Sequence, residues 1–114
     1  MMFRTAPAAV IVIPAYNAAQ TLGRTIESAV GALVYCTDVQ GLAVEAEIIV
    51  VDDASSDATA TIAEAWTKRH PAVRLVRNAE NRGPGFSRNE GVRRSTAPFL
   101  FFLDADDVFS LQGR

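Results

Sequence analysis

Hydrophobic residues in this chain form short continuous runs, which alternate with segments whose apolar residues recur at helical spacing. Runs rich in valine, isoleucine and phenylalanine are typical of buried strands. They predict strands at 8–14, 48–51, 73–77 and 99–103. The helical spacing predicts helices at about 18–36, 57–69 and 84–94. Strand and helix alternate throughout, which indicates an α/β fold with a parallel, doubly wound, Rossmann-like sheet.

Composition fits one small globular domain spanning residues 1–114, with 49% hydrophobic and 21% charged residues. A formal net charge of −2 gives no argument for a nucleic-acid partner or an anionic membrane surface. No stretch approaches the ~20 apolar residues of a membrane-spanning helix. The single cysteine, Cys36, allows no intrachain disulfide, favours a reducing compartment such as the cytoplasm, and is expected to pack in the core.

Polar clusters follow three of the predicted strands, at 16–17, 52–53 and 104–107. In open parallel sheets, ligands bind beyond the carboxyl ends of the strands, at the point where strand order reverses. One such cluster has little meaning, but three at equivalent places predict a binding site along this edge of the sheet.

The last cluster places Asp104, Asp106 and Asp107 within four positions, after five apolar residues. Two carboxylates about 5 Å apart repel by about 3 kcal/mol at an effective dielectric constant near 20, so a counter-charge is expected. Alternate residues of an extended segment share a side, so Asp104 and Asp106 are expected to converge while Ala105 faces away. Carboxylates suit Mg²⁺ or Mn²⁺, whereas one histidine and one cysteine argue against zinc. The alternative is a solvated acidic turn or a helix N-terminus.

The other clusters could hold the organic part of a ligand. Asp52 and Asp53 end a strand, where an aspartate can accept hydrogen bonds from a nucleobase or a ribose. The alternative is a simple turn, in which Ser56 and Asp57 cap the next helix. Tyr16 offers a face for base stacking, and Asn17 is a polar turn residue, although a lone tyrosine after a strand more often simply packs.

The stretch "NRGPGFSRNEG" at 81–91 combines a glycine-rich turn, a helix start and arginines. Backbone N–H groups of such a turn can approach an anion, and Arg82 or Arg88 could grip a diphosphate in bidentate fashion. Arg93 and Arg94 instead fit a solvated helix face. The stretch is neither a dinucleotide-binding fingerprint after the first strand nor a Walker A loop.

Four motifs in this order resemble the N-terminal half of family 2 glycosyltransferases of the GT-A fold. They are "VIPAYN" at 12–17, "VVDDASSD" at 50–57, "NRGPGFSRNEG" at 81–91 and "FLDADD" at 102–107. The resemblance covers about residues 10–108. It implies four strands in the order 3-2-1-4 with about three helices. It also implies transfer of a sugar from a UDP- or GDP-sugar type of donor to an acceptor glycan or lipid, as in the synthesis of cell-envelope polysaccharide.

The resemblance also implies roles for the matched positions. Tyr16 would stack against or flank the base, on a floor shaped by Pro14 and Ala15, with Asn17 in the same motif. Asp52 and Asp53 would read base and ribose, with Asp53 favoured for the base. The loop from Asn81 to Gly83 and Arg88 would border the sugar-nucleotide. Asp104 and Asp106 match the D-x-D signature, with Asp104 near ribose or metal and Asp106 as a ligand of Mg²⁺ or Mn²⁺.

Three departures from the family pattern stand out. Ala54 stands where the family often has glycine, and Ser87 where it often has alanine; both are small. The acceptor site and the general base of an inverting transfer are expected beyond Arg114, so no catalytic residue is assigned. The chain is expected to be a donor-binding piece of a longer enzyme, attached at most to the cytoplasmic face of a membrane, and inactive alone.

Rival functions remain open. A non-catalytic module that associates with itself or with a partner is the second hypothesis, because a fourth strand beside the first would leave an exposed apolar edge. A sugar nucleotidylyltransferase would need a glycine-rich loop after the first strand, which "PAYNAAQT" lacks. A phosphorelay receiver domain would need acids after the first strand and a late lysine, and Lys68 is the only lysine.

Overall fold

The computed structural model describes residues 8–34 and 46–108 of the chain. It contains four strands: β1 (Ala9–Ala15), β2 (Ala46–Asp52), β3 (Val73–Arg77) and β4 (Phe99–Phe102). Three helices alternate with them: α1 (Leu22–Val34), α2 (Thr59–Arg69) and α3 (Pro84–Arg93). The predicted alternation is therefore confirmed. The expected core packing of Cys36 and the expected end of the first helix lie outside the described residues.

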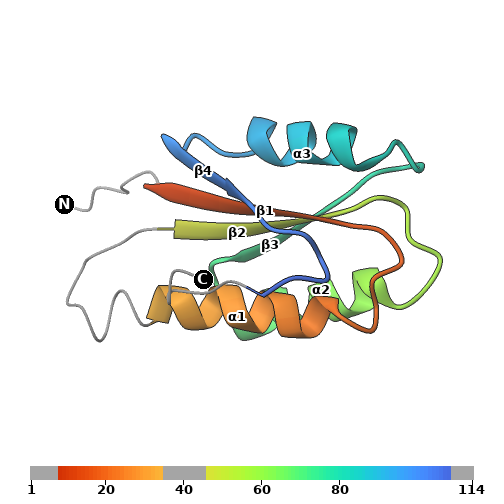
Figure 1. The fold of residues 1–114 in the computed structure, drawn as a ribbon, viewed down its shortest axis with the longest axis horizontal. Coiled ribbons are helices and arrows are strands. Elements are labelled where there is room, and N and C mark those ends of the chain that lie inside the picture. Colours follow the sequence, from red (N-terminus) through yellow and green to blue (C-terminus); the bar gives the residue numbers. More distant parts are fainter. Residues whose placement is uncertain (1–7, 35–45, 109–114) are drawn as a thin grey trace.

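The sheet is entirely parallel, with the order β3-β2-β1-β4 implied by the resemblance. β1 and β2 form its centre, with Ile11 opposite Ile48 and Ala15 opposite Asp52. All carboxyl ends thus point the same way, which brings the three polar clusters to one edge. As Figure 1 shows, α3 covers one face of the sheet, and α1 and α2 cover the other.

Both central strands are apolar on both faces, because each face has its own helical cover. On the side of α1 and α2, a buried cluster includes Ile11, Ile13, Ile48 and Val50. On the other side the cluster comprises Val10, Val12, Ile49, Val51 and Val76. This is the burial expected for a doubly wound sheet, and it leaves β1 and β2 as a rigid platform for the residues that follow them.

Gly91 allows α3 to lie very close to β1. A Cβ atom at this position would meet Val12 Cγ1 at 2.4 Å, well inside van der Waals contact. The helix therefore cannot keep this distance with any larger residue. The other end of the helix, its first turn, lies toward the carboxyl ends of β1 and β2 (Figure 1).

β4 is an edge strand, and its side chains are exposed. It pairs with β1 alone in the described part of the chain, with Val12 opposite Phe102. Phe99, Phe101 and Phe102 are 65%, 50% and 48% exposed. A run this apolar is typical of a strand covered on both faces and edges, but no such cover exists among the described residues.

The start of α2 differs from the prediction. The helix begins at Thr59, and its N-cap residue Ala58 provides no side-chain hydrogen bond. Asp57 still accepts the Thr59 N–H at 2.9 Å, but Ser56 binds across to the loop after β1 instead of capping. Its hydroxyl, the group that would cap the helix, contacts Asn17 Oδ1 of that loop at 3.3 Å. None of the described helices is long and apolar enough to cross a membrane.

Candidate functional site

A cavity of about 300 Å³ opens at the carboxyl ends of β1 and β2, where α3 begins. Its lining comes from three segments far apart in the sequence: Pro14, Ala15, Tyr16, Asp53, Asn81, Gly83, Pro84 and Ser87. The structure thereby joins the "PAYN", "DD" and "NRGPG" motifs around one space. Asn17 and Asp52, which were predicted to lie in the motifs that bind the base and ribose, do not line the cavity.

Asp53 is the polar centre of this cavity, and its side chain is almost fully buried at 3% exposure. Its Oδ1 accepts hydrogen bonds of 2.8 Å from Asn78 Nδ2 and from the Arg82 N–H. Its Oδ2 accepts the Gly83 N–H at 2.8 Å. Gly83 has φ 94°, a conformation that favours glycine and directs its N–H at the carboxylate. The glycine-rich loop therefore holds an anion of the protein itself.

Opposing effects set the pKa of Asp53. Burial raises it, but several hydrogen bonds to the charged form together outweigh burial and bring the pKa below the ordinary value of 3.8. The donors are Arg82 N–H, the Asn78 amide, Gly83 N–H and the Ser87 hydroxyl. Asp53 is therefore a carboxylate at neutral pH, able only to accept hydrogen bonds. Its Oδ2 accepts the Gly83 N–H, and a carboxylate oxygen can accept a further hydrogen bond from a ligand.

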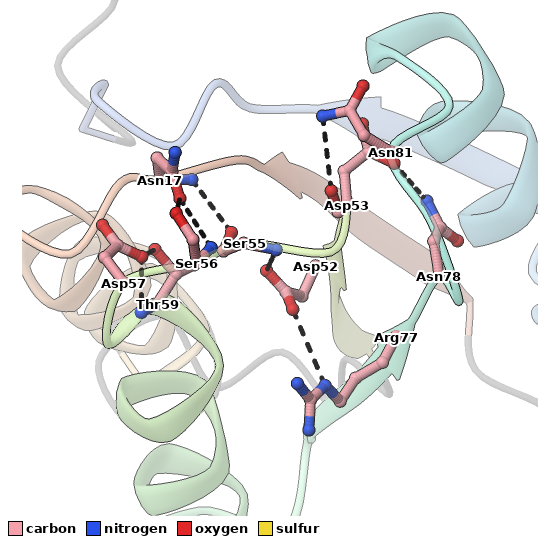
Figure 2. Close-up of polar contacts among 10 residues, drawn as sticks. All are labelled: Asn17, Asp52, Asp53, Ser55, Ser56, Asp57, Thr59, Arg77, Asn78 and Asn81. Atoms are coloured by element: carbon pink, nitrogen blue, oxygen red, sulfur yellow. Dashed lines mark hydrogen bonds and ion pairs between the residues drawn. The ribbon is translucent and has the colours of Figure 1, made fainter.

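Tyr16 forms an exposed wall of the cavity, with 53% of its surface accessible. The loop that carries it is tied to the loop after β2 (Figure 2). Asn17 N–H donates to Ser55 Oγ at 2.9 Å, and Asn17 Oδ1 accepts the Ser56 N–H at 2.9 Å. Asn17 has φ 49°, which asparagine tolerates better than most residues. Its role in the structure is thus to lock two loops together.

Two further bonds strengthen this connection. The Ala18 N–H donates to Thr59 Oγ1 at 2.8 Å, and the Ala19 N–H donates to Asp57 Oδ2 at 3.2 Å. The hydrogen bond from the Thr59 hydroxyl is the main cause that keeps the pKa of Asp57 below 3.8. Asp57, like Asn17, fixes the loop that positions Tyr16.

Asp52 is turned away from the cavity, although it directly precedes Asp53 (Figure 2). It is fully buried; its Oδ1 accepts the Ser55 N–H at 3.3 Å. Its Oδ2 has no hydrogen-bond partner in the described part of the chain and lies 3.6 Å from Nε of Arg77. The two aspartates point to opposite sides because strand residues alternate. Asp52 therefore pairs with Arg77 and does not contribute to the cavity.

Residues 104–107 form a tight turn rather than the expected extended segment. The Asp107 N–H donates to the Asp104 carbonyl at 3.0 Å, which closes the turn. Ala105 is buried, while Asp104, Asp106 and Asp107 are exposed. Ala105 thus faces away as predicted, but extended alternation is the wrong reason: its methyl group packs into the core beneath the turn.

The carboxylates of this acidic turn have no hydrogen bond or ion pair with other described residues. No group of three or more potential metal-ligating side chains is found within 8–34 and 46–108. The carboxylates of Asp104 and Asp106, which are unpaired among the described residues and exposed, still fit an ion that completes its coordination with water and phosphate oxygens, as Mg²⁺ and Mn²⁺ commonly do.

The arginines divide into separate groups. Arg82 stacks on Phe86, with 4.5 Å from its Cζ to the ring centroid. Arg88 lies over Phe102 of β4 at 6.0 Å, between α3 and the strand that leads into the acidic turn. Arg93 and Arg94 are exposed and pair with Glu90, which fits a solvated helix face.

Sequence reasoning missed Asn78, and it treated Ser87 only as a departure from the family pattern. Asn78 Nδ2 donates to both Asp53 Oδ1 and Ser87 Oγ, at 2.8 and 3.0 Å. Asn78 directly follows β3, so its place at a strand end was an available signal. Ser87 gave no such signal, because only the three-dimensional structure shows that its buried hydroxyl faces Asp53.

Comparison with known proteins gives a consistent result. The model of the family described as "Glycosyl transferase family 2" matches residues 10–112. Succinoglycan biosynthesis protein ExoO of Rhizobium meliloti is 40% identical over 102 residues, covering 90% of this chain and 26% of that protein. The crystal structure of S. aureus TarS in complex with UDP has a TM-score of 0.71 at 27% identity, covering 88% of this chain and 28% of that one.

A further solved structure shares the fold. Mannosyltransferase PcManGT from Pyrobaculum calidifontis, in complex with GDP-Man and Mn²⁺, has a TM-score of 0.71 at 24% identity, covering 92% of this chain and 29% of that one. The chain therefore spans about a quarter of the length of these proteins, and the residues that form the cavity lie within the matched segment.

Proposed function

Because the chain belongs to glycosyl transferase family 2, we propose that its cavity binds the nucleotide of a nucleotide-diphospho-sugar. The enzyme concerned would transfer the sugar to an acceptor glycan or lipid. One observation carries the proposal: a buried carboxylate, Asp53, is held ionised at the centre of a cavity beside an exposed aromatic ring. The complex of TarS with UDP, a protein 27% identical to this chain, supports the same ligand class.

The free acceptor site of Asp53 favours particular bases. Uracil and guanine present a ring N–H that can donate to Oδ2, whereas cytosine and adenine present an unprotonated ring nitrogen at the corresponding edge. Tyr16 supplies a ring face against which either base can stack. A UDP- or GDP-sugar is therefore preferred over a CDP- or ADP-sugar. With cytosine or adenine, the buried Asp53 carboxylate would face an unprotonated ring nitrogen, so two hydrogen-bond acceptors would meet, which is unfavourable.

We propose that the diphosphate lies toward the acidic turn at 104–107. Asp104 and Asp106 would hold Mg²⁺ or Mn²⁺ there, and the bound ion would act as a Lewis acid that neutralises charge on the departing nucleoside diphosphate. Arg88 lies over the strand that leads into this turn and carries a guanidinium suited to a phosphate oxygen. Asn81 and Gly83 border the sugar-nucleotide beside the base.

The reaction proposed is an inverting displacement. An acceptor oxygen forms the new bond to the anomeric carbon as the bond to the diphosphate breaks; the electron pair leaves with the nucleoside diphosphate, and a general base takes the acceptor proton. No described residue is assigned as that base. We place the enzyme in the cytoplasm or at its membrane face, and we expect the 114-residue chain to bind donor without transferring sugar.

Calorimetry with Mn²⁺ tests this proposal. UDP or GDP should bind to the chain, and CDP and ADP should bind at least about tenfold more weakly, the effect of one unsatisfied buried acceptor. Tyr16→Ala should weaken all of them, and Glu64→Gln on the exposed face of α2 should change nothing. Binding of CDP as tight as that of UDP would refute base reading by Asp53. Absence of any nucleotide binding would refute the proposed function.

A second candidate function rests on β4. This edge strand carries four exposed apolar residues and no charge or proline, so two copies could pair without placing like charges opposite one another. In a solution of this chain alone, a second copy is the available partner. Sedimentation velocity should then show a dimer that Phe101→Lys converts to monomer. A wild-type monomer at high concentration would contradict self-association.

A further inference from the structure

Two threonines of α1 and the loop before it connect to the acidic turn some 80 residues away. Thr25 is 1% exposed, and its hydroxyl lies 2.8 Å from the carbonyl oxygen of Ala105 and 2.6 Å from that of Asp107. The Thr21 hydroxyl donates to the same Ala105 carbonyl at 2.9 Å. These bonds reach the main chain of the turn between Asp104 and Asp107, and leave its carboxylates untouched.

The hydroxyl of Thr25 is not used mainly for the local hydrogen bond that is common for a threonine within a helix. A threonine within a helix commonly donates to the carbonyl four residues earlier, and Thr25 lies 3.3 Å from the Thr21 carbonyl. The contacts with Ala105 and Asp107 are shorter, so its single proton is directed mainly to the turn. The Ala105 carbonyl has two lone pairs, and both hydroxyl groups can use them at once.

Burial of Ala105 adds an apolar anchor to the polar one. Its side chain packs into the core cluster that includes Leu22 and Ile26 of α1. The turn is therefore attached to α1 by its backbone and by its one apolar side chain. The mutual repulsion of the exposed carboxylates would otherwise favour an open, extended segment.

We propose that Thr25, assisted by Thr21, is the positioning residue that holds Asp104 and Asp106 on one tight turn, ready for a divalent cation and the diphosphate of the donor. The inference rests on the proposed function for its ligand. Thr25 touches neither the cation nor the donor, and acts through the main chain of Ala105 and Asp107. The same helix start also follows the loop of Tyr16, so α1 connects the base wall to the acidic turn.

Binding measurements on the 114-residue chain separate this role from general stability. Thr25→Val keeps the shape but removes the proton. It should weaken Mn²⁺-dependent binding of UDP about tenfold, the effect of one lost buried hydrogen bond. Binding of uridine without metal should be unchanged, because the base cavity lies elsewhere. Thr25→Ser should restore affinity to within about twofold, and Thr67→Val, which removes the hydroxyl bond to Glu64 on α2, should have no effect.

Amide exchange of Asp107 in the metal-free chain gives a readout that does not depend on the ligand. Its N–H closes the turn, so Thr25→Val should speed its exchange while leaving amides of β2 unchanged. Unchanged exchange of Asp107 would overturn the positioning role, even where UDP binds. Faster exchange in a chain that binds no nucleotide would refute the proposed function and leave the role in fixing the turn intact. Should Thr25→Val not fold, Thr21→Val, which removes one bond, must show the same change at Asp107.

Discussion

Two acidic sites lie at the same edge of the sheet, and they are built in opposite ways. Asp53, after β2, is 3% exposed, and the protein satisfies its carboxylate through four groups. Asp104 and Asp106, after β4, are exposed, and their carboxylates have no hydrogen bonds or ion pairs with the rest of the described chain. In the first site hydrogen bonds hold the carboxylate itself, whereas in the second the protein holds the turn and leaves its carboxylates free of bonds to the described residues.

The position of the parent strands explains this difference. β2 is central, so α3 and the loop after β3 can surround the residue that follows it. β4 lies at the edge of the sheet formed by the described residues, and Thr25 of α1 binds the main chain of the turn that follows it. The proposed roles fit this difference: a group that recognises one partner benefits from rigidity, while a metal ligand must exchange water and phosphate, so open carboxylates would suit it.

The largest effect is expected for Asp53→Asn. The new amide would direct its NH₂ group at a backbone N–H of Arg82 or Gly83, so donors would face donors. The free energy of unfolding should fall by about 2–3 kcal/mol in urea titrations, as for lost hydrogen bonds to a buried charge. UDP binding should be lost as well. The neutral control is Glu64→Gln, and a stability equal to wild type would show that Asp53 is not organised by these bonds.

The double change Asp104→Asn/Asp106→Asn is expected to alter metal-dependent binding and to leave stability nearly unchanged. Binding of UDP should no longer respond to Mn²⁺, because the proposed ligands are gone. The free energy of unfolding should stay within about 0.5 kcal/mol of wild type, since exposed carboxylates without partners contribute little to it. Calorimetry and urea titration measure the two quantities. Asp107→Asn in the same turn is the matched control, and loss of the Mn²⁺ response in that variant would reassign the ligand.

Acid titration tests the Asp53 site through a smaller effect. The pKa of Asp53 is lowered in the folded chain, so its contribution to stability is complete above its unfolded pKa of about 3.8 and is lost as the pH falls below it. The melting temperature of wild type should therefore fall more steeply between pH 5 and pH 3 than that of Asp53→Asn. Parallel curves for wild type and Asp53→Asn would contradict a lowered pKa.

The fold followed from the sequence because its signals are local. Apolar runs defined β1 to β4, and β3 was predicted with its observed bounds. The helix starts were less accurate: α1 begins at Leu22, four residues after the predicted start, and Ala18 and Ala19 belong to a loop whose N–H groups donate to Thr59 and Asp57. These contacts join residues about 40 positions apart, which no local pattern contains.

The candidate site was predictable only in part, for the same physical reason. Strand ends located Tyr16, Asp53 and Asp104, since parallel strands bring their carboxyl ends together. They could not tell which of the two adjacent aspartates faces the cavity and which faces Arg77, or that Thr25 reaches Ala105. Packing between segments that are distant in the sequence decides which partners a side chain meets. It therefore also decides which of the predicted residues surround the cavity.

The smallest effect concerns the backbone directly after Asp53. Ala54 has φ 61°, a conformation that is strained by about 1 kcal/mol for alanine and relaxed for glycine. Glycine also loses more chain entropy on folding, so Ala54→Gly should raise the free energy of unfolding by only about 0.5 kcal/mol. Ala79→Gly, in an exposed loop without positive φ, should lower it slightly. If both changes destabilise the chain equally, the loop at Asp53 carries no strain, and the hydrogen bonds alone account for its rigidity.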